Sequence, residues 1–188
     1  MIAYRNYYES VLTDVCINRI EELVQKIPGS SDMYSDAISL LIETGELETG
    51  LSDILCKEQD KILPEITFCR NISLCSGLIV CNLWIHNVLS MDRLYRIHTF
   101  LSALKQRNLP LYIELGVPEG FVFYGLYPET FLDAAENFYN EKRPDSVIVI
   151  GLRSIGTQLS TIVASRLELF GCKVATCTVR PRGEPFNR

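Results

Sequence analysis

Seven consecutive residues near the C-terminus have the types and the spacing of an anion-binding turn. They are Gly151, Leu152, Arg153, Ser154, Ile155, Gly156 and Thr157, and they directly follow an apolar run at residues 147–150. Glycines permit a tight turn between a strand and a helix, and the start of that helix directs free N–H groups and a positive dipole end at one place. One guanidinium and two hydroxyls add further donors. The pattern predicts a phosphate site.

Two other interpretations of this turn remain open. The first is an ordinary strand-to-helix turn, in which glycine only lets the two elements approach each other. The second is a dinucleotide-binding turn with the pattern G-x-G-x-x-G, but Arg153 stands where the middle glycine is needed. The next strand also ends in Thr178, Val179 and Arg180, without the acid that would bind a ribose hydroxyl.

The elements around the turn alternate between strand and helix, so the second half of the chain predicts a mainly parallel sheet with flanking helices. Alternating apolar and aromatic residues, proline and glycine set the expected bounds. We expect strands at 109–115, 120–126, 146–150 and 173–179, and helices at 129–141 and 158–170.

The first 107 residues have apolar side chains at helical spacing and short connections, which predicts a small helical bundle. The expected helices are 4–27, 34–44 ending at Gly45, 46–57, 64–84 and 91–107. The mostly apolar fourth helix is expected at the centre. The predicted fold class is therefore α/β, with a helical region at 1–107 and a partial α/β domain at 108–188.

Charge is divided unevenly along the chain. From Gly151 onward there are six basic and two acidic residues, a balance of +4, which leaves −9 for the first 150 residues of a chain whose net charge is −5. An acidic body argues against broad nucleic-acid binding, whereas a basic C-terminal part suits a small anionic ligand. Solvated arginines are the alternative.

The positions of the cysteines and histidines and the hydropathy of the chain bear on metal binding, cellular compartment and membrane insertion. The seven cysteines form no CxxC pair, and His86 and His98 lie in helical segments, so no metal site is expected. Scattered cysteines in apolar segments are typical of reduced thiols in the cytoplasm. No N-terminal signal pattern is visible, and the apolar stretch 72–85 is shorter than the ~20 residues of a membrane span, which favours a buried core helix.

The turn resembles the pyrophosphate-binding loop of type I phosphoribosyltransferases, in which an apolar strand leads through a glycine turn into a helix. The matching residues are G-L-R-S-I-G-T-Q-L-S from Gly151 onward. The upstream segment PEGFVFYGLYPETFLDAA and the downstream segment TVRPRGEPFNR are similar to uncharacterised bacterial phosphoribosyltransferase-like proteins. The resemblance covers the C-terminal part of the chain and extends only loosely to the helical region.

The resemblance implies that residues 151–157 bind phosphoribosyl pyrophosphate, pyrophosphate or a nucleotide phosphate through backbone N–H groups, with Arg153 adding charge. Mg²⁺ would accompany phosphoribosyl pyrophosphate, although the sequence itself requires no cofactor. Tyr127 and Glu129 would line the same cleft, unless they serve only as the first turn of a helix. Arg180 and Arg182, just past the last strand, would contact phosphate or be surface charge.

The chain departs from this family after the first loop. No aspartate and no TGGT-like turn follow Gly151, although active members hold the ribose with paired acids in a second loop. We therefore expect either a fragment of a longer enzyme or a module without chemistry, inactive as an isolated chain, and no catalytic residue is identified. The alternative function is a non-enzymatic interaction module that pairs through its helices or through an open sheet edge, as in a homodimer.

Overall fold

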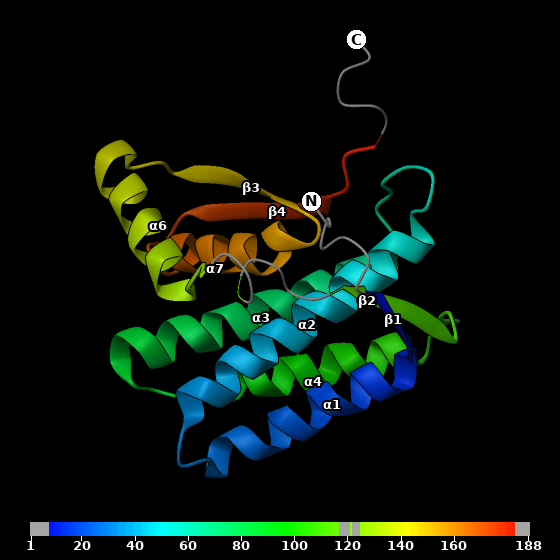
Figure 1. Cartoon of the computed structure of the whole chain (residues 1–188). Coiled ribbons are helices and arrows are strands. Elements are labelled where there is room, and N and C mark those ends of the chain that lie inside the picture. The colour runs from blue at the N-terminus through cyan, green and yellow to red at the C-terminus, as the bar shows by residue number, and fades with distance from the viewer. Residues whose placement is uncertain (1–7, 117–120, 122–124, 183–188) are drawn as a thin grey trace.

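Figure 1 shows a computed structural model of the chain, in which 65% of the described residues are helical and their strands form two small sheets. The structure describes residues 8–116, 121 and 125–182. In chain order the elements are β1 (Tyr8–Leu12), α1 (Thr13–Lys26), the short 3₁₀ helix η2 (Ile27–Gly29), α2 (Met33–Leu55), α3 (Pro64–His86), α4 (Met91–Lys105), β2 (Tyr112–Gly116), α6 (Pro128–Lys142), β3 (Ser146–Leu152), α7 (Ile155–Leu169) and β4 (Lys173–Val179). The fold is mixed α/β.

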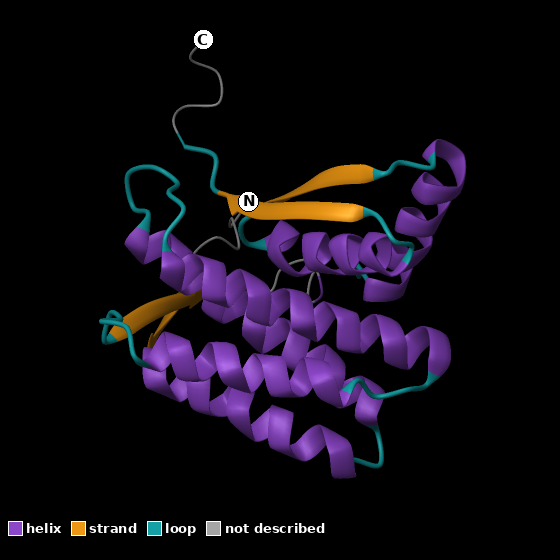
Figure 2. Cartoon of the chain, turned by 180° about the vertical axis from the view of Figure 1, so that it is seen from behind, coloured by secondary structure: helices purple, strands orange, loops and turns teal. Residues whose placement is uncertain are grey.

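The elements are stacked in layers (Figures 1 and 2). The sheet of β3 and β4 lies above α7, with α6 beside that helix, then come α2 and α3, and α1 and α4 form the lowest layer. A single hydrophobic core joins the helices of the first 107 residues to Ile113, Leu132 and Ile162. Apolar packing is therefore continuous across the predicted boundary at 107/108.

The helical prediction is confirmed for α3 and α4 and is wrong at Gly45. Instead of ending there, α2 continues to Leu55, so the two expected helices are one. Gly45 lies where α2 meets α7, and a Cβ atom at this position would come within 2.6 Å of the Gln158 Cγ atom. This glycine serves a close helix contact, whereas the sequence prediction assigned it to a helix end.

The prediction of one mainly parallel sheet is also wrong. Among the described residues, β2 pairs only with β1, in an antiparallel register from Tyr8↔Gly116 to Leu12↔Tyr112. Residues 8–12, expected to be helical, form β1 because this pairing buries Val11 against Ile113. The strand expected at 120–126 falls largely on residues 120 and 122–124, which lie outside the described residues.

The C-terminal unit agrees with the prediction more closely. The expected helix at 129–141 is α6, and the expected strands are β3 and β4, which pair in parallel from Ser146↔Lys173 to Leu152↔Val179. The last helix, α7, begins at Ile155, three residues before the expected start. The turn is shorter than predicted, so Gly156 and Thr157 belong to the first turn of the helix.

The central helix α3 is long and apolar, and it is largely covered by other parts of the protein. It is long and apolar enough to cross a membrane by length and composition, but 67% of its most apolar window is buried inside the protein. The prediction of a buried core helix at 72–85 is therefore confirmed.

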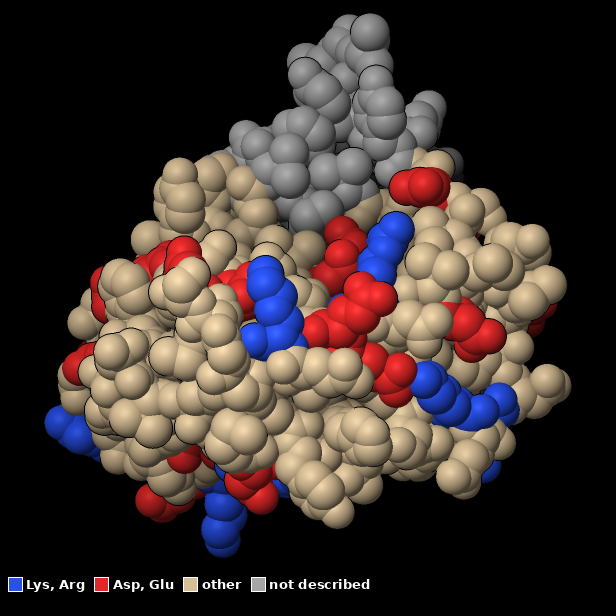
Figure 3. Space-filling model, turned by 90° about the horizontal axis from the view of Figure 1, so that it is seen from below, with Lys and Arg blue, Asp and Glu red and all other residues tan. Residues whose placement is uncertain are grey.

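The lowest layer carries charges of both signs. Lys and Arg side chains lie among Asp and Glu on the face shown in Figure 3. One ion pair joins α4 to α1, with 2.7 Å between Lys105 Nζ and Glu21 Oε2.

Candidate functional site

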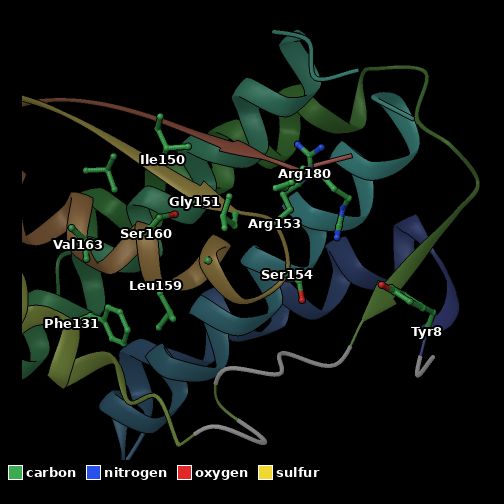
Figure 4. A pocket seen from close by; sticks show the side chains of 14 residues that line it. Tyr8, Phe131, Ile150, Gly151, Arg153, Ser154, Leu159, Ser160, Val163 and Arg180 are labelled. Carbon is green, nitrogen blue, oxygen red and sulfur yellow. The ribbon is translucent and has the colours of Figure 1, made fainter. Parts of the chain in front are cut away.

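The predicted anion turn lies at the carboxyl end of β3, where the chain enters α7. It borders a pocket of about 820 Å³, which is also lined by Arg180 and by apolar side chains (Figure 4). Ser154 is the residue before α7; it has φ 94° and ψ −97°, and its side chain caps no described N–H group. The first turn of α7 contains no acidic residue. The start of this helix therefore presents its positive dipole end beside the pocket without an acid in its own first turn, although Glu46, Asp53 and Glu114 line the neighbouring cleft.

The two glycines of the turn hold β3 close to α7. A Cβ atom on Gly151 would come within 2.5 Å of the Gly156 carbonyl oxygen, and one on Gly156 within 3.3 Å of the Gly151 carbonyl carbon. Gly151 therefore needs glycine for packing, with or without a ligand, and a side chain at Gly156 would be tight. The ordinary tight turn remains a sufficient explanation of the glycines by themselves.

Arg153 is held in a buried ion-pair network. Its side chain is 1% exposed, and Nε donates to Asp53 Oδ1 at 2.8 Å while Nη2 pairs with Asp60. Nη1 donates to the Thr178 carbonyl at 3.3 Å. Each nitrogen of the guanidinium thus has a protein acceptor. The geometry supports a structural role for Arg153, in contrast to the phosphate contact implied by the resemblance.

Arg180 and Arg182 extend the same network. Arg180 forms a two-point pair with Asp53, with 2.7 Å from Nε to Oδ1, and Arg182 Nη1 lies 3.5 Å from Asp60 Oδ1. Burial alone would raise the pKa of Asp60, but the hydrogen bonds from Arg153 and the Arg180 N–H, with the nearby positive charges, hold that pKa below its usual value. The two carboxylates thus neutralise most of this basic group.

Of the hydroxyls in the turn, Ser154 is the one that reaches the pocket. Thr157 is fully buried, and its Oγ1 lies 3.0 Å from that of Thr49 on α2. Ser154 lines both the large pocket and a narrow cleft beside it. Of the two hydroxyls of the turn, Ser154 is therefore the one placed to donate a hydrogen bond to a ligand there.

Tyr127 and Glu129 do not line the pocket. Tyr127 is exposed just before α6, and Glu129 in the first turn of that helix accepts a hydrogen bond from the Tyr34 hydroxyl of α2. Burial and this carboxylate raise the pKa of Tyr34 above its usual range. Glu129 thus joins α6 to the helical layer, and α6 instead contributes Phe131 to the pocket.

A second buried ion pair was not foreseen from the sequence. Glu48 on α2 is fully buried, and its Oε2 lies 3.3 Å from Nη1 of Arg70 on α3. Arg70 also donates to the hydroxyls of Ser160, Thr161 and Thr176 and to the Thr157 carbonyl. The sequence feature that could have indicated this pair is an arginine inside an apolar helix, because a buried arginine needs a charged or hydrogen-bonding partner. This network supports the first turns of α7 from below.

A protonatable carboxylate lies near the turn. Glu46 on α2 shares the narrow cleft with Ser154 and Gln158. Burial, reinforced by the charge of Glu43, raises the pKa of Glu46 to about 7, while Arg19 opposes the shift. The cleft therefore changes charge near neutral pH.

No group of three or more His, Cys, Asp or Glu side chains is arranged to hold a metal ion in the part of the chain that the structure describes. All seven cysteines are free thiols, and Cys177 is the exposed one. Comparisons with protein-family models, with curated proteins and with solved structures found no match to this chain.

Proposed function

We propose that the chain binds the phosphate groups of a small phosphorylated molecule at the start of α7, as a phosphoribosyltransferase-like module. The observation that carries this proposal is the uncapped N-terminus of α7, free of acids in its first turn, which borders a pocket of about 820 Å³ at the carboxyl ends of two parallel strands. Ligands of α/β proteins bind at this end of the sheet. The sequence resemblance of residues 151–157 to a pyrophosphate loop supports the same site.

The backbone supplies most of the binding in this proposal. N–H groups at the start of α7 donate to phosphate oxygens, and the Ser154 hydroxyl adds one side-chain donor. Arg153 and Arg180 contribute a positive potential at the wall, reduced by the carboxylates with which they pair. Mg²⁺ would accompany the ligand, held by its phosphate oxygens.

Binding without turnover is the activity that we assign to the isolated chain. Electrostatic stabilisation of a leaving pyrophosphate is one part of a transferase site, and a proton-transfer group and ribose contacts are the others. The phosphate ligands in question are phosphoribosyl pyrophosphate, pyrophosphate and nucleotides, which share the group that this turn recognises.

Calorimetric titration of pyrophosphate with Mg²⁺ tests the site through Ser154. In Ser154→Asp a carboxylate occupies the helix start, and we expect the affinity to fall at least about tenfold through charge repulsion. Ser154→Asn is the matched neutral variant and should stay within about threefold of wild type. Ser146→Asp adds the same charge at the opposite end of β3 and should change little.

Two results would overturn the proposal. One is the absence of any binding heat at millimolar pyrophosphate in folded wild type. The other is equal affinity of the Ser154→Asp and Ser154→Asn variants. In either case the glycines serve only the close packing of β3 on α7.

A further inference from the structure

The sheet of β3 and β4 is covered by helices on one face only. On the covered face, Ala135 of α6 and Leu167 of α7 pack in one apolar cluster with the strand residues Val147, Val149 and Val174. In Figures 1 and 2 the helices of the molecule lie on this side of the sheet. Parallel strands are normally buried on both faces. Among the described residues, no element packs on the outer face of this sheet.

The uncovered face is apolar. Ile148, Ile150 and Leu152 of β3 point outward and are 73%, 58% and 57% exposed. From β4 the outward residues are Lys173, Ala175 and Cys177, so the single charge lies at the beginning of that strand. A row of three large aliphatic side chains without charge at its centre is typical of the core of a protein interface.

An apolar groove continues this face beyond the edge of β3. Its volume is about 510 Å³, and it runs between β3 and α6 with Ala134, Phe138 and Val163 on the helical side and Ile148 and Ile150 on the other. Phe138 is itself exposed. The row of aliphatic side chains and the apolar groove thus lie side by side. When two copies are related by a two-fold axis, the row of each copy can pack into the groove of the other.

The size of this surface indicates what kind of partner it fits. Two strands of seven residues give a face of roughly 23 Å by 10 Å, and the groove about doubles the width, for a flat area on the order of 500 Å². A standard stable interface buries about 800 Å² per partner. The patch is large enough for reversible self-association and too small for an obligate complex.

We propose that a second copy of this chain covers the outer face of β3 and β4, so that the protein forms a reversible homodimer. Ile148, Ile150 and Leu152 of each copy pack against the same patch of the other, with the groove beside α6 at the rim. This contact uses the outer face of the sheet, and it borders the proposed phosphate site because Ile150 and Leu152 also line the pocket at the start of α7.

Sedimentation velocity from about 5 µM to about 200 µM tests the proposal, a range that brackets a dissociation constant in the micromolar class. We expect wild type to shift from monomer to dimer. Ile150→Glu should remain monomeric across the range, because it buries a charge in the contact without touching the core. Ile62→Glu is the matched control: Ile62 is 96% exposed on the connection before α3, and its variant should dimerise as wild type does.

Cys177 provides a second readout on the same face. Its labelling by a water-soluble thiol reagent should slow about fivefold between the lowest and highest concentrations in wild type and stay constant in Ile150→Glu. Circular dichroism confirms that each variant is folded. The proposal is overturned if wild type is monomeric at the highest concentration, if Ile150→Glu still dimerises, or if Ile62→Glu abolishes the dimer.

Discussion

Replacing Arg153 with methionine separates a structural arginine from a ligand-binding one. The guanidinium is almost completely buried and pairs with Asp53 and Asp60 across the contact between the C-terminal unit and the helical layer. Methionine keeps the aliphatic stem and removes every donor. The variant therefore leaves two acids of the helical layer without one of their basic partners.

The size of the effect follows from the exposure of the two acids. Removing one partner of a buried ion pair typically costs about 3–5 kcal/mol. Here Asp53 and Asp60 are 31% and 29% exposed, and they keep contacts to Arg180 and Arg182, so water and these arginines recover part of the loss. We expect the free energy of unfolding to fall by about 2–3 kcal/mol.

Urea unfolding measures this loss, and pyrophosphate titration measures the ligand effect. With a slope of about 2 kcal/mol per molar urea, the midpoint should fall by about 1–1.5 M. Arg107→Met is the control, because it breaks the 2.7 Å pair with Glu65 at an exposed arginine and should cost no more than about 1 kcal/mol. Pyrophosphate affinity of folded Arg153→Met should stay within about threefold of wild type.

The opposite pattern would refute this reasoning. If Arg153→Met were as stable as Arg107→Met but lost pyrophosphate affinity at least about tenfold, the arginine would be a ligand contact. Its pairing with the two aspartates would then not be the dominant arrangement in solution.

Two further predictions concern buried charges beneath the turn. Arg70→Met leaves the Glu48 carboxylate buried without its guanidinium, so we expect a loss of about 3–5 kcal/mol in urea unfolding. A loss no larger than that of Arg107→Met, the exposed control pair, would contradict the prediction. The second prediction concerns Glu46, whose pKa is raised to about 7, so that the folded protein holds this proton more tightly than the unfolded chain does. The resulting contribution to the free energy of unfolding is complete below the usual glutamate pKa and is lost as the pH rises through 7. The change in the free energy of unfolding caused by Glu46→Gln should therefore be about 1–3 kcal/mol more favourable near about pH 8 than near about pH 5. An equal change at both pH values would show that the carboxyl is solvated.

Local patterns in the sequence were sufficient for the C-terminal unit. Pro128 marks the start of α6, a continuous apolar run marks β3, and Gly171 follows the end of α7, so these elements were predicted from their own residues. Gly45 carries an ambiguous local signal. Its role depends on Gln158 across the contact between α2 and α7, and no pattern around Gly45 contains that partner.

The candidate site was predictable in its backbone and less so in its side chains. The strand and the glycine turn appear where the sequence indicates, and the helix begins three residues earlier than predicted. The partners of Arg153, however, lie 100 and 93 residues away along the chain, and composition alone does not reveal which acid pairs with which arginine. The same holds for Arg70, whose acceptors come from α2, α7 and β4.

The uneven division of charge along the chain therefore has a different meaning in the folded protein. A basic C-terminal part suggests free cations for an anion, yet Arg153, Arg180 and Arg182 face Asp53 and Asp60 of the acidic part. Three positive and two negative charges leave about one net positive charge in this network, and Glu46 and Glu114 line the adjoining cleft, so long-range attraction of a phosphate is weak. Affinity at this site must then come mainly from short-range N–H donors at the start of α7, and it should depend less on salt than affinity at a site built from unpaired arginines. A steep loss of pyrophosphate affinity with added salt would point to arginines that leave their aspartates when the ligand arrives.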